Sequence, residues 1–303
     1  MPFNYIESLK LAFKNNIYES SSEEDRKKEI IRLTLNALSD KPERIVGFLR
    51  FQSVKQKVVQ FLTQSLEIKT GDMLEEFFTD LLGFHYTNLT KLVNGYKCDQ
   101  LFQKIENGIT TIFLIEQKIR DDHDSSKKNG QVENFENKIN QLRAIYPNAQ
   151  IRSYEWFIDE SFKKYPDFYN NKFNSFKTGK EAWFDGGVFY GGDLINTLCG
   201  TGTWDRFVEA YNVVKREYVS DIGLIINDYD FDNDPEDIVY KSLTKKRDSL
   251  IELFYSDDFD EVRRTFFSEN LMEEKIFIYF NEKKKKSKTG EKFISNYKQK
   301  RGI

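Results

Sequence analysis

The feature that most constrains the fold of this chain is the dipeptide Asn107-Gly108, which lies between two apolar, β-branched segments. Both residues tolerate the positive φ angles of a type I′ turn, so this dipeptide is the strongest short-range signal for a β-hairpin. With a two-residue loop, counting outward along both strands places Asp99 opposite Glu116. The sequence therefore predicts a hairpin that brings two carboxylates face to face.

The opposed carboxylates indicate a site for a divalent cation. Directly opposed side chains in a hairpin have Cβ atoms roughly 4.5–5.5 Å apart, so two carboxylates at these positions repel each other. A cation between them relieves the repulsion, and Mg²⁺ binds one or two carboxylates while keeping waters for phosphate chemistry. Lys118 lies two residues beyond Glu116, on the same face of the strand. Asp99, Glu116 and Lys118 are therefore the candidate catalytic residues.

The spacing of these residues resembles the pattern of the PD-(D/E)xK nucleases, and most closely that of the type II restriction endonucleases. Here the pattern reads Asp99 and then Glu116-Gln117-Lys118, with Cys98 in place of the usual proline, which carries no chemistry. The resemblance implies a restriction-endonuclease-like α/β core of mixed α+β character, in which helices flank a central mixed β-sheet. It also implies Mg²⁺ as the cofactor, and we expect Asp99, Glu116 and the backbone carbonyl of Gln117 to hold it.

A coincidental match is the alternative, because an Asp followed later by Glu-x-Lys occurs by chance, and an exposed strand can alternate Glu and Lys for solubility alone. Residues 112–115, Ile-Phe-Leu-Ile, indicate instead a central strand with apolar residues on both faces. Charged residues at the end of such a buried strand are seldom without a role. We therefore favour the nuclease interpretation.

The two helices expected around the hairpin each add one candidate. An amphipathic helix is predicted to open at Thr70, and by the resemblance Glu75 on this helix faces the active site, where it could hold a second metal or a metal-bound water. A solvated helix face is the alternative for Glu75, because a charge beside an apolar stripe is ordinary. After the hairpin, apolar spacing predicts a helix over residues 131–142, and Gln131 near its start matches a supporting Gln of some family members.

Two polar segments are candidates for DNA contact. The segment 120–130 is predicted to be a loop, and a metal site at His123 is disfavoured because the spacing of a ligand set is absent. The basic stretch 283–301 is either a solubilising tail or a phosphate-binding segment, and a nuclease core favours the second. These segments supply the DNA-binding candidates His123, Asp124, Ser125, Lys127, Lys128, Lys284, Lys286 and Lys300.

The order of the expected elements divides the chain into three regions. Residues 1–65 form a helical N-terminal region, and residues 66–160 form the catalytic core, with the order helix, three strands, helix and strand. Residues 161–303 form a C-terminal region of mixed structure, which we expect to recognise bases because the core supplies only phosphate chemistry. Within it, the glycine-rich stretch 184–193 lacks the P-loop signature and is predicted to be a turn between buried aromatic residues.

Composition limits the class of protein further. The formal net charge of −3 excludes a uniformly basic nucleic-acid binder, so DNA contact must come from local basic patches. The two cysteines give no disulfide framework, and neither a signal peptide nor a transmembrane run is evident in the sequence. We therefore expect a cytoplasmic protein without a membrane partner, and the richness in Lys, Asn, Ile, Phe and Tyr suggests a bacterial or phage source.

The sequence thus predicts a type II restriction endonuclease that cuts double-stranded DNA at a short specific sequence with the help of Mg²⁺. We expect a homodimer, because the two-fold symmetry of a protein mirrors a palindromic site, and a functional pairing with a DNA methyltransferase. One alternative is a structure-specific repair or replication nuclease of the same fold. A non-catalytic DNA-binding protein is another, and the intact set of two carboxylates and a lysine argues against it.

Overall fold

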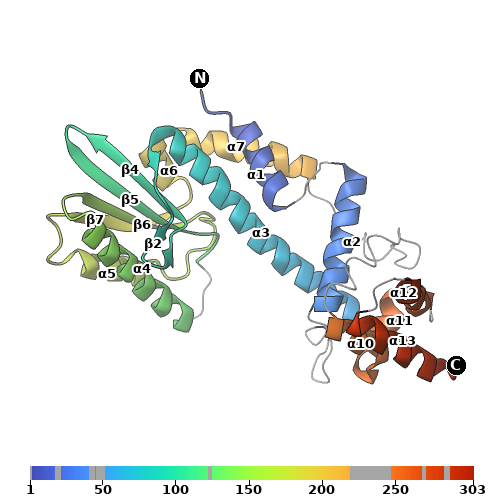
Figure 1. The fold of residues 1–303 in the computed structure, drawn as a ribbon. Helices are drawn as coiled ribbons and strands as arrows, with labels where there is room; N and C mark the ends of the chain where they lie inside the picture. Colours follow the sequence, from blue (N-terminus) through green and yellow to red (C-terminus); the bar gives the residue numbers. More distant parts are fainter. Residues whose placement is uncertain are drawn as a thin grey trace. The chain divides into compact units, whose positions relative to one another are not determined.

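The computed structural model describes residues 2–17, 22–40, 45, 52–121, 125–218, 247–267, 271–282 and 287–303. The chain divides into two compact units (Figure 1). The first unit comprises Met1–Ile17 and Lys69–Glu217, and the second comprises Tyr18–Ile68 and Tyr218–Ile303. None of the described helices has the length and apolarity that crossing a membrane requires.

A five-stranded mixed sheet forms the centre of the first unit, with the strand order β1-β4-β5-β6-β7. The pairs β1–β4 and β4–β5 are antiparallel, whereas β5–β6 and β6–β7 are parallel. The strands of this sheet are β1 (Thr87–Asn88), β4 (Gln100–Glu106), β5 (Ile109–Lys118), β6 (Gln150–Phe157) and β7 (Phe184–Tyr190). A separate two-stranded sheet joins β2 (Leu92–Val93) to β3 (Tyr96–Lys97).

The β4–β5 hairpin turns at the predicted dipeptide. Asn107 has φ 52° and Gly108 has φ 78°, which are the left-handed values that a type I′ turn requires. The register runs outward without a bulge as far as Gln100, which pairs with Ile115. The next position along the two chains brings Asp99, one residue before β4, to the level of Glu116. The predicted register is therefore confirmed.

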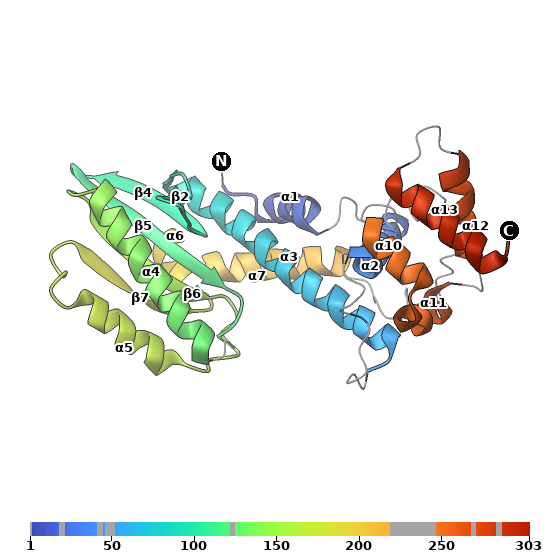
Figure 2. The same ribbon diagram turned by 60° about the horizontal axis from the view of Figure 1, so that its bottom comes forward.

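Helices α4 (Ser125–Ile145) and α5 (Pro166–Lys177) cover one face of the sheet, and Figure 2 shows them beside each other there. The apolar stripe of α4 that the sequence predicted packs into the core on this face. The core there consists mainly of Leu101, Ile112, Leu114, Val132, Phe135, Ile139, Leu142, Ile151, Phe157, Tyr169, Phe173 and Phe184. This packing holds α4 against the strands that carry the candidate residues.

The other face of the sheet is covered by aromatic side chains from helices. Phe78 of α3 (Val54–His85) contacts the buried Trp156 of β6 with ring centroids 4.6 Å apart. Trp204 and Phe207 of α7 (Thr203–Tyr218) join this cluster. The helices α1 (Tyr5–Asn16) and α6 (Asp193–Cys199) complete the first unit. Each buried aromatic ring removes 150–250 Å² from water, so these rings dominate the energetics of this layer. The fold class predicted from the sequence, a mixed sheet flanked by helices, is confirmed.

The described elements of the second unit are helical. They are α2 (Glu23–Asp40), the part of α3 before Lys69, α10 (Arg247–Tyr255), the 3₁₀-helix η2 (Asp257–Phe259), α11 (Asp260–Phe266), α12 (Leu271–Glu282) and α13 (Lys288–Arg301). Phe293 of α13 is fully buried against the rings of Phe254 and Phe280. The basic segment from Lys288 onward is therefore a packed helix rather than a loose tail.

Several boundaries differ from the sequence prediction. No helix opens at Thr70, because α3 is continuous from Val54. The first of the three strands expected in the core was predicted over residues 84–93, and within that range only Thr87–Asn88 and Leu92–Val93 are strands. Helix α4 begins at Ser125, so residues 125–130 are helical and not loop. Helix extension is cheap once an amphipathic stretch is docked, which overrides the weak propensities of Ser, Asn and Gly.

The largest difference is β7, which lies where a turn was predicted. Residues 184–190 pair in parallel with β6, and Gly186 lies opposite Ser153. At Gly186 a Cβ would lie 2.3 Å from the backbone oxygen of Ser153, whereas at Gly187 a Cβ would meet only the Phe189 ring at 3.7 Å. The first glycine therefore permits close strand approach, which a glycine-rich sequence alone does not distinguish from a turn.

We expect Gly186→Ala to destabilise the protein by about 1–3 kcal/mol, because the added methyl overlaps a backbone atom that cannot move aside. Gly187→Ala is the matched control and should leave stability unchanged or raise it by a few tenths of a kcal/mol. Urea denaturation followed by circular dichroism measures both. Equal stability of the two variants would contradict the close approach of β7 to β6.

Candidate active site

Asp99, Glu116 and Lys118 converge at the end of the β4–β5 hairpin remote from its turn. The Lys118 ammonium lies 3.2 Å from Asp99 Oδ2 and 3.8 Å from Glu116 Oε2. Asp99 Oδ2 also accepts a hydrogen bond of 2.8 Å from the backbone N–H of Gln117. The hairpin register thus brings together the three residues that the sequence singled out.

Lys138 is a fourth member of this cluster, and the sequence analysis missed it. It lies on α4 with only 4% of its surface exposed, and its ammonium is 2.5 Å from Glu116 Oε1. The available signal was a lysine between the core positions Phe135 and Leu142 of the amphipathic helix, on the face that docks against the sheet. A lysine in that position needs a buried acid, and Glu116 supplies it.

Glu155 of β6 is a fifth charged group, and the sequence pattern did not single it out. Its Cα pairs in register with that of Glu116 in the neighbouring parallel strand, so both side chains lie on the same face. Glu155 is 2% exposed, and its Oε2 has no hydrogen-bond partner among the described residues. Burial raises its pKa to about 7, although the nearby Lys118 acts in the opposite direction.

The electrostatics of the cluster are dominated by burial and by repulsion between acids. Burial and the neighbouring Asp99 raise the pKa of Glu116 above its ordinary value, and the two lysines only partly oppose this. Burial alone would lower the pKa of Lys118, but Asp99 and Glu116 outweigh it and the net shift is upward. Lys118 is therefore held as a charged ammonium between carboxylates.

Asp99 and Glu116 could hold a divalent metal ion. Both described contacts of Asp99 use Oδ2, which leaves Oδ1 for a metal, and Lys138 occupies Glu116 Oε1, so that Glu116 Oε2 has only the longer contact of 3.8 Å with Lys118. Burial raises the pKa of Glu116 and Asp99 raises it further, and a cation would remove the repulsion behind this second contribution. In the described part of the chain no group of three or more Asp, Glu, His or Cys side chains is arranged to bind a metal. Two carboxylates completed by water match the preference of Mg²⁺.

The Gln117 carbonyl, the third expected ligand, accepts a hydrogen bond of 3.1 Å from the Lys118 ammonium. Gln131 lies on α4, and its Oε1 is buried without a hydrogen-bond partner among the described residues. None of the described hydrogen bonds joins Gln131 to Asp99, Glu116 or Lys118. Its supporting role stays a prediction.

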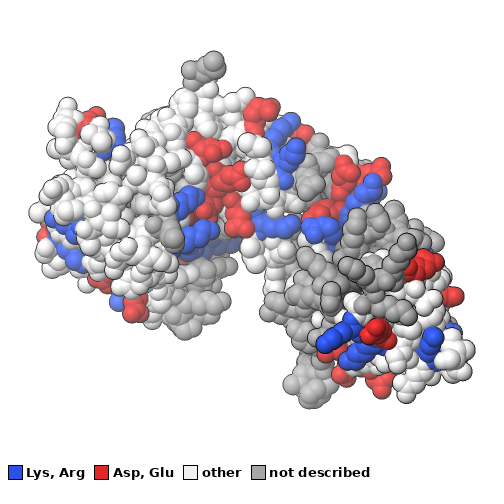
Figure 3. All heavy atoms as spheres, in the orientation of Figure 1, with Lys and Arg blue, Asp and Glu red and all other residues white. Residues whose placement is uncertain are grey.

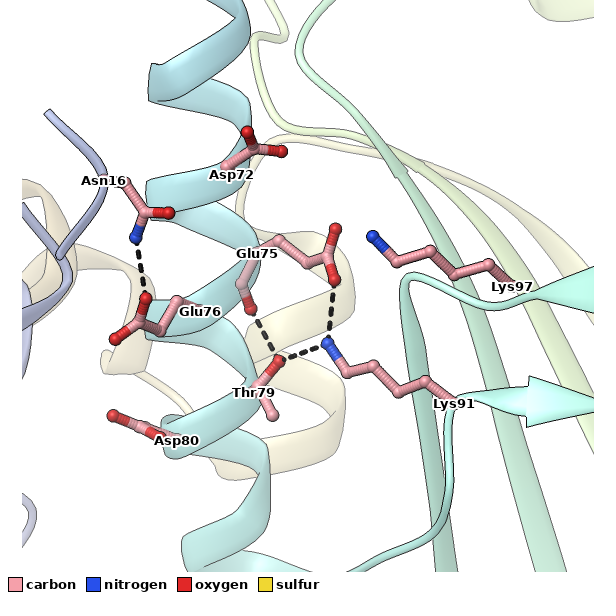
Figure 4. A pocket seen from close by; sticks show the side chains of 8 residues that line it. All are labelled: Asn16, Asp72, Glu75, Glu76, Thr79, Asp80, Lys91 and Lys97. Carbon is pink, nitrogen blue, oxygen red and sulfur yellow. Dashed lines mark hydrogen bonds and ion pairs between the residues drawn. The ribbon is translucent and has the colours of Figure 1, made fainter. Parts of the chain in front are cut away.

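The Glu75 side chain faces a pocket that two lysines help to line. Its Oε1 lies 2.9 Å from the Lys91 ammonium, and its carboxylate points between the amines of Lys91 and Lys97 (Figure 4). These residues line a pocket of about 410 Å³ with Asn16, Asp72, Glu76, Thr79 and Asp80. The Glu75 backbone carbonyl accepts a hydrogen bond of 2.8 Å from the buried Gln100, next to Asp99. Glu75 is thus linked to the site through its backbone, and metal binding by its side chain stays a prediction.

The DNA-binding candidates fall into three groups. His123, Asp124, Lys284 and Lys286 lie outside the described residues. Ser125, Lys127 and Lys128 belong to the start of α4, which corrects their expected place in a loop. Lys300 of α13 forms an ion pair of 2.9 Å with the buried Glu273.

The mixed sheet flanked by helices, with two acids and a lysine at the end of its hairpin, defines a nuclease core of the restriction-endonuclease type. Residues 84–215 match the family model described as type II restriction endonuclease, HinfI. The matched segment is less than half of the chain, and it supports a type II restriction endonuclease, which is a site-specific deoxyribonuclease of the hydrolase class; members of this family generally use Mg²⁺. A search of curated protein sequences gave no match. The matched segment contains Asp99, Glu116, Lys118, Lys138 and Glu155.

We expect Lys138→Met to destabilise the metal-free protein by about 3 kcal/mol, because it leaves the buried Glu116 carboxylate without its closest cation. The double variant Lys138→Met with Glu116→Gln should recover most of that loss, since no buried charge is left unpaired. The control is Lys104→Met, which removes an exposed ion pair with Glu106 and should change stability by no more than about 0.5 kcal/mol. Chemical denaturation measures all three, and wild-type stability of the single Lys138 variant would contradict the pairing.

The raised pKa of Glu155 predicts a pH dependence of stability without metal. The folded state favours the protonated acid. The contribution of Glu155 to the free energy of unfolding is therefore complete below the ordinary glutamate pKa of 4.5 and is lost as the pH rises to about 7. The loss amounts to about 3 kcal/mol across this window. Glu155→Gln cannot ionise and should escape the loss, becoming more stable than the wild type at pH 8 and nearly equal at pH 5. Parallel stability curves for the two proteins over this range would refute the assignment.

Proposed function

We propose that this endonuclease cuts double-stranded DNA at a specific short sequence by Mg²⁺-dependent hydrolysis of a phosphodiester bond. The observation that carries the proposal is the convergence of Asp99, Glu116 and Lys118 within one charged cluster of the matched segment. Bound Mg²⁺ supplies a Lewis acid that polarises the phosphate and lowers the pKa of a bound water. Asp99 and Glu116 would hold it, together with the Gln117 carbonyl and water molecules.

The protein's own groups have separate roles in this proposal. The Gln117 N–H fixes the Asp99 carboxylate, and Lys138 fixes one oxygen of Glu116, so both acids are oriented before substrate arrives. Lys118 orients the attacking water or stabilises the negative charge that develops on the phosphoryl oxygens. Lys118 has 24% of its side chain exposed, which allows it to meet a phosphate. In-line hydrolysis then leaves a 5′-phosphate and a 3′-hydroxyl.

DNA binding rests on local basic groups. Acidic and basic side chains are interspersed on the face drawn in Figure 3, which agrees with a net charge of −3. We propose that Ser125, Lys127 and Lys128 contact DNA phosphates away from the cut phosphate, because they lie at the start of the helix that carries Lys138 about three turns further on. Phosphate contacts of this kind add affinity without sequence preference and weaken with salt.

We further propose that the enzyme acts as a homodimer on a palindromic site, alongside a methyltransferase that protects the host site. A closed two-fold dimer presents the same surface twice, which matches the symmetry of such a site. Sedimentation of the protein with cognate DNA tests the dimer, and one protomer per site would refute it.

Asp99→Asn and Lys118→Met should each lower the cleavage rate by about 10³-fold or more, because each removes a charge that acts on the reacting phosphate. Binding to the same DNA in Ca²⁺ should change little, and a gel-shift assay measures it. Lys104→Met, an exposed position on the same hairpin, serves as the control and should cut normally.

Digestion of phage DNA in Mg²⁺ tests the class of activity. Discrete fragments with defined ends are expected for a site-specific enzyme. Cleavage limited to branches, nicks or ends would instead favour a repair nuclease of the same fold, and full activity of either active-site variant would overturn the residue assignments.

A further inference from the structure

The carboxylate of Glu155 is not explained by the roles proposed for Asp99, Glu116 and Lys118. It is almost completely buried, its Oε2 has no hydrogen-bond partner among the described residues, and it lies in register with Glu116. Leaving a charged or polar oxygen unpaired inside a protein is costly, so each such group requires an explanation. We propose that Glu155 is a positioning residue, which holds the Lys118 ammonium when Asp99 and Glu116 bind the metal.

A metal held by Asp99 and Glu116 would take from Lys118 the acceptors of its ammonium. Without metal its ammonium is held by Asp99 Oδ2 at 3.2 Å, by the Gln117 carbonyl at 3.1 Å and by Glu116 Oε2 at 3.8 Å. These three oxygens belong to the residues that are expected to face the cation. If Asp99 and Glu116 held a divalent ion, its charge would repel the ammonium, and Glu116 Oε2 and the Gln117 carbonyl would be shared with it. Lys118 then needs another acceptor to stay charged and oriented.

Glu155 is the acceptor that remains for the Lys118 ammonium. Among the described charged neighbours with the largest effects, Lys118 favours the ionised form of Glu155, whereas Glu116, Asp121 and Asp99 disfavour it. Glu155 in turn raises the pKa of Lys118, with a smaller effect than Asp99 and Glu116. Because Glu155 pairs with Glu116 across parallel strands, it lies on the same face as Lys118, two residues further along β5. A turn of the Lys118 ammonium towards Glu155 would therefore give both groups a partner of opposite charge.

The other described neighbours of Glu155 cannot neutralise its charge. Asp121 is fully buried and accepts hydrogen bonds from the Tyr165 N–H and the Tyr190 hydroxyl, so it offers no donor while ionised. The Tyr169 hydroxyl is buried and unpartnered among the described residues, and its pKa is raised by burial and then by Glu155 and Asp121. A phenol can donate one hydrogen bond but supplies no charge. Lys118 is the described cation that can neutralise Glu155.

This inference rests on the proposed metal-dependent cleavage, and its test separates the two. The test compares wild type with Glu155→Gln, Glu155→Asp and the control Ser153→Ala. Ser153 lies on the same strand and face, is fully buried and has an unpartnered hydroxyl oxygen, but carries no charge. Three quantities are measured: the single-turnover cleavage rate in saturating Mg²⁺, the affinity for Ca²⁺ by calorimetry, and the metal-free stability at pH 8.

We expect Glu155→Gln to slow cleavage by about 10- to 100-fold, because a misplaced catalytic group costs rate of this order. Its Ca²⁺ affinity should stay at the wild-type value, and its stability at pH 8 should not fall. Glu155→Asp keeps the charge and should recover part of the rate, while Ser153→Ala should cut normally. A crystal structure with DNA and Ca²⁺ should place the Lys118 ammonium within hydrogen-bond distance of Glu155.

Several results would overturn the inference. A normal rate for Glu155→Gln would show that Lys118 needs no such partner. A parallel loss of Ca²⁺ affinity and rate would make Glu155 a metal ligand instead, and a fall in stability that matches the loss of rate would make it a structural residue. If the wild type cuts no DNA in Mg²⁺, the proposed function fails and this inference fails with it, whereas active wild type with an unaffected Glu155 variant rejects the inference alone.

Discussion

The repulsion between Asp99 and Glu116 is the interaction on which the rest of the first unit depends. A type I′ hairpin with unbroken register leaves these two acids side by side, and burial adds to their repulsion. The fold offsets this with a lysine from the same strand and a second from α4. Helix α4 must therefore dock in one rotational setting, because only that setting brings Lys138 to Glu116. The apolar stripe of α4 and the ion pair specify the same arrangement.

The parts of this site that the sequence predicted are those fixed by local geometry. Asn107 and Gly108 determine the turn, and counting from the turn determines that Asp99 meets Glu116. Lys138 and Glu155 reach the site through a docked helix and a parallel crossover, and neither has a spacing that reveals its partner. Their signal is a charge that shares a helix face or a strand with buried core residues, and this signal predicts the need for a partner without naming it.

The same distinction explains the errors in the element boundaries. The stretch 184–190 contains two adjacent glycines, which favour a turn when judged locally, yet pairing with β6 makes it the strand β7. Residues 125–130 have weak helix propensity, yet they extend a helix that the core holds in place. In both cases tertiary contacts decide the conformation, and the order of helices and strands is more secure than their ends.

The two lysines of the cluster differ in burial, and this difference separates their roles. The Lys138 side chain is 5% exposed and contacts a single acid, so it can fix Glu116 but cannot reach a phosphate. The Lys118 side chain is 24% exposed and is shared among three oxygens, so no single contact holds it. A lysine ammonium is a point charge on a flexible stem with three rotatable donors, so it can exchange one acceptor for another when a cation and a substrate arrive. The static lysine therefore orients the metal-binding acid, and the adaptable one is available to the reacting phosphate.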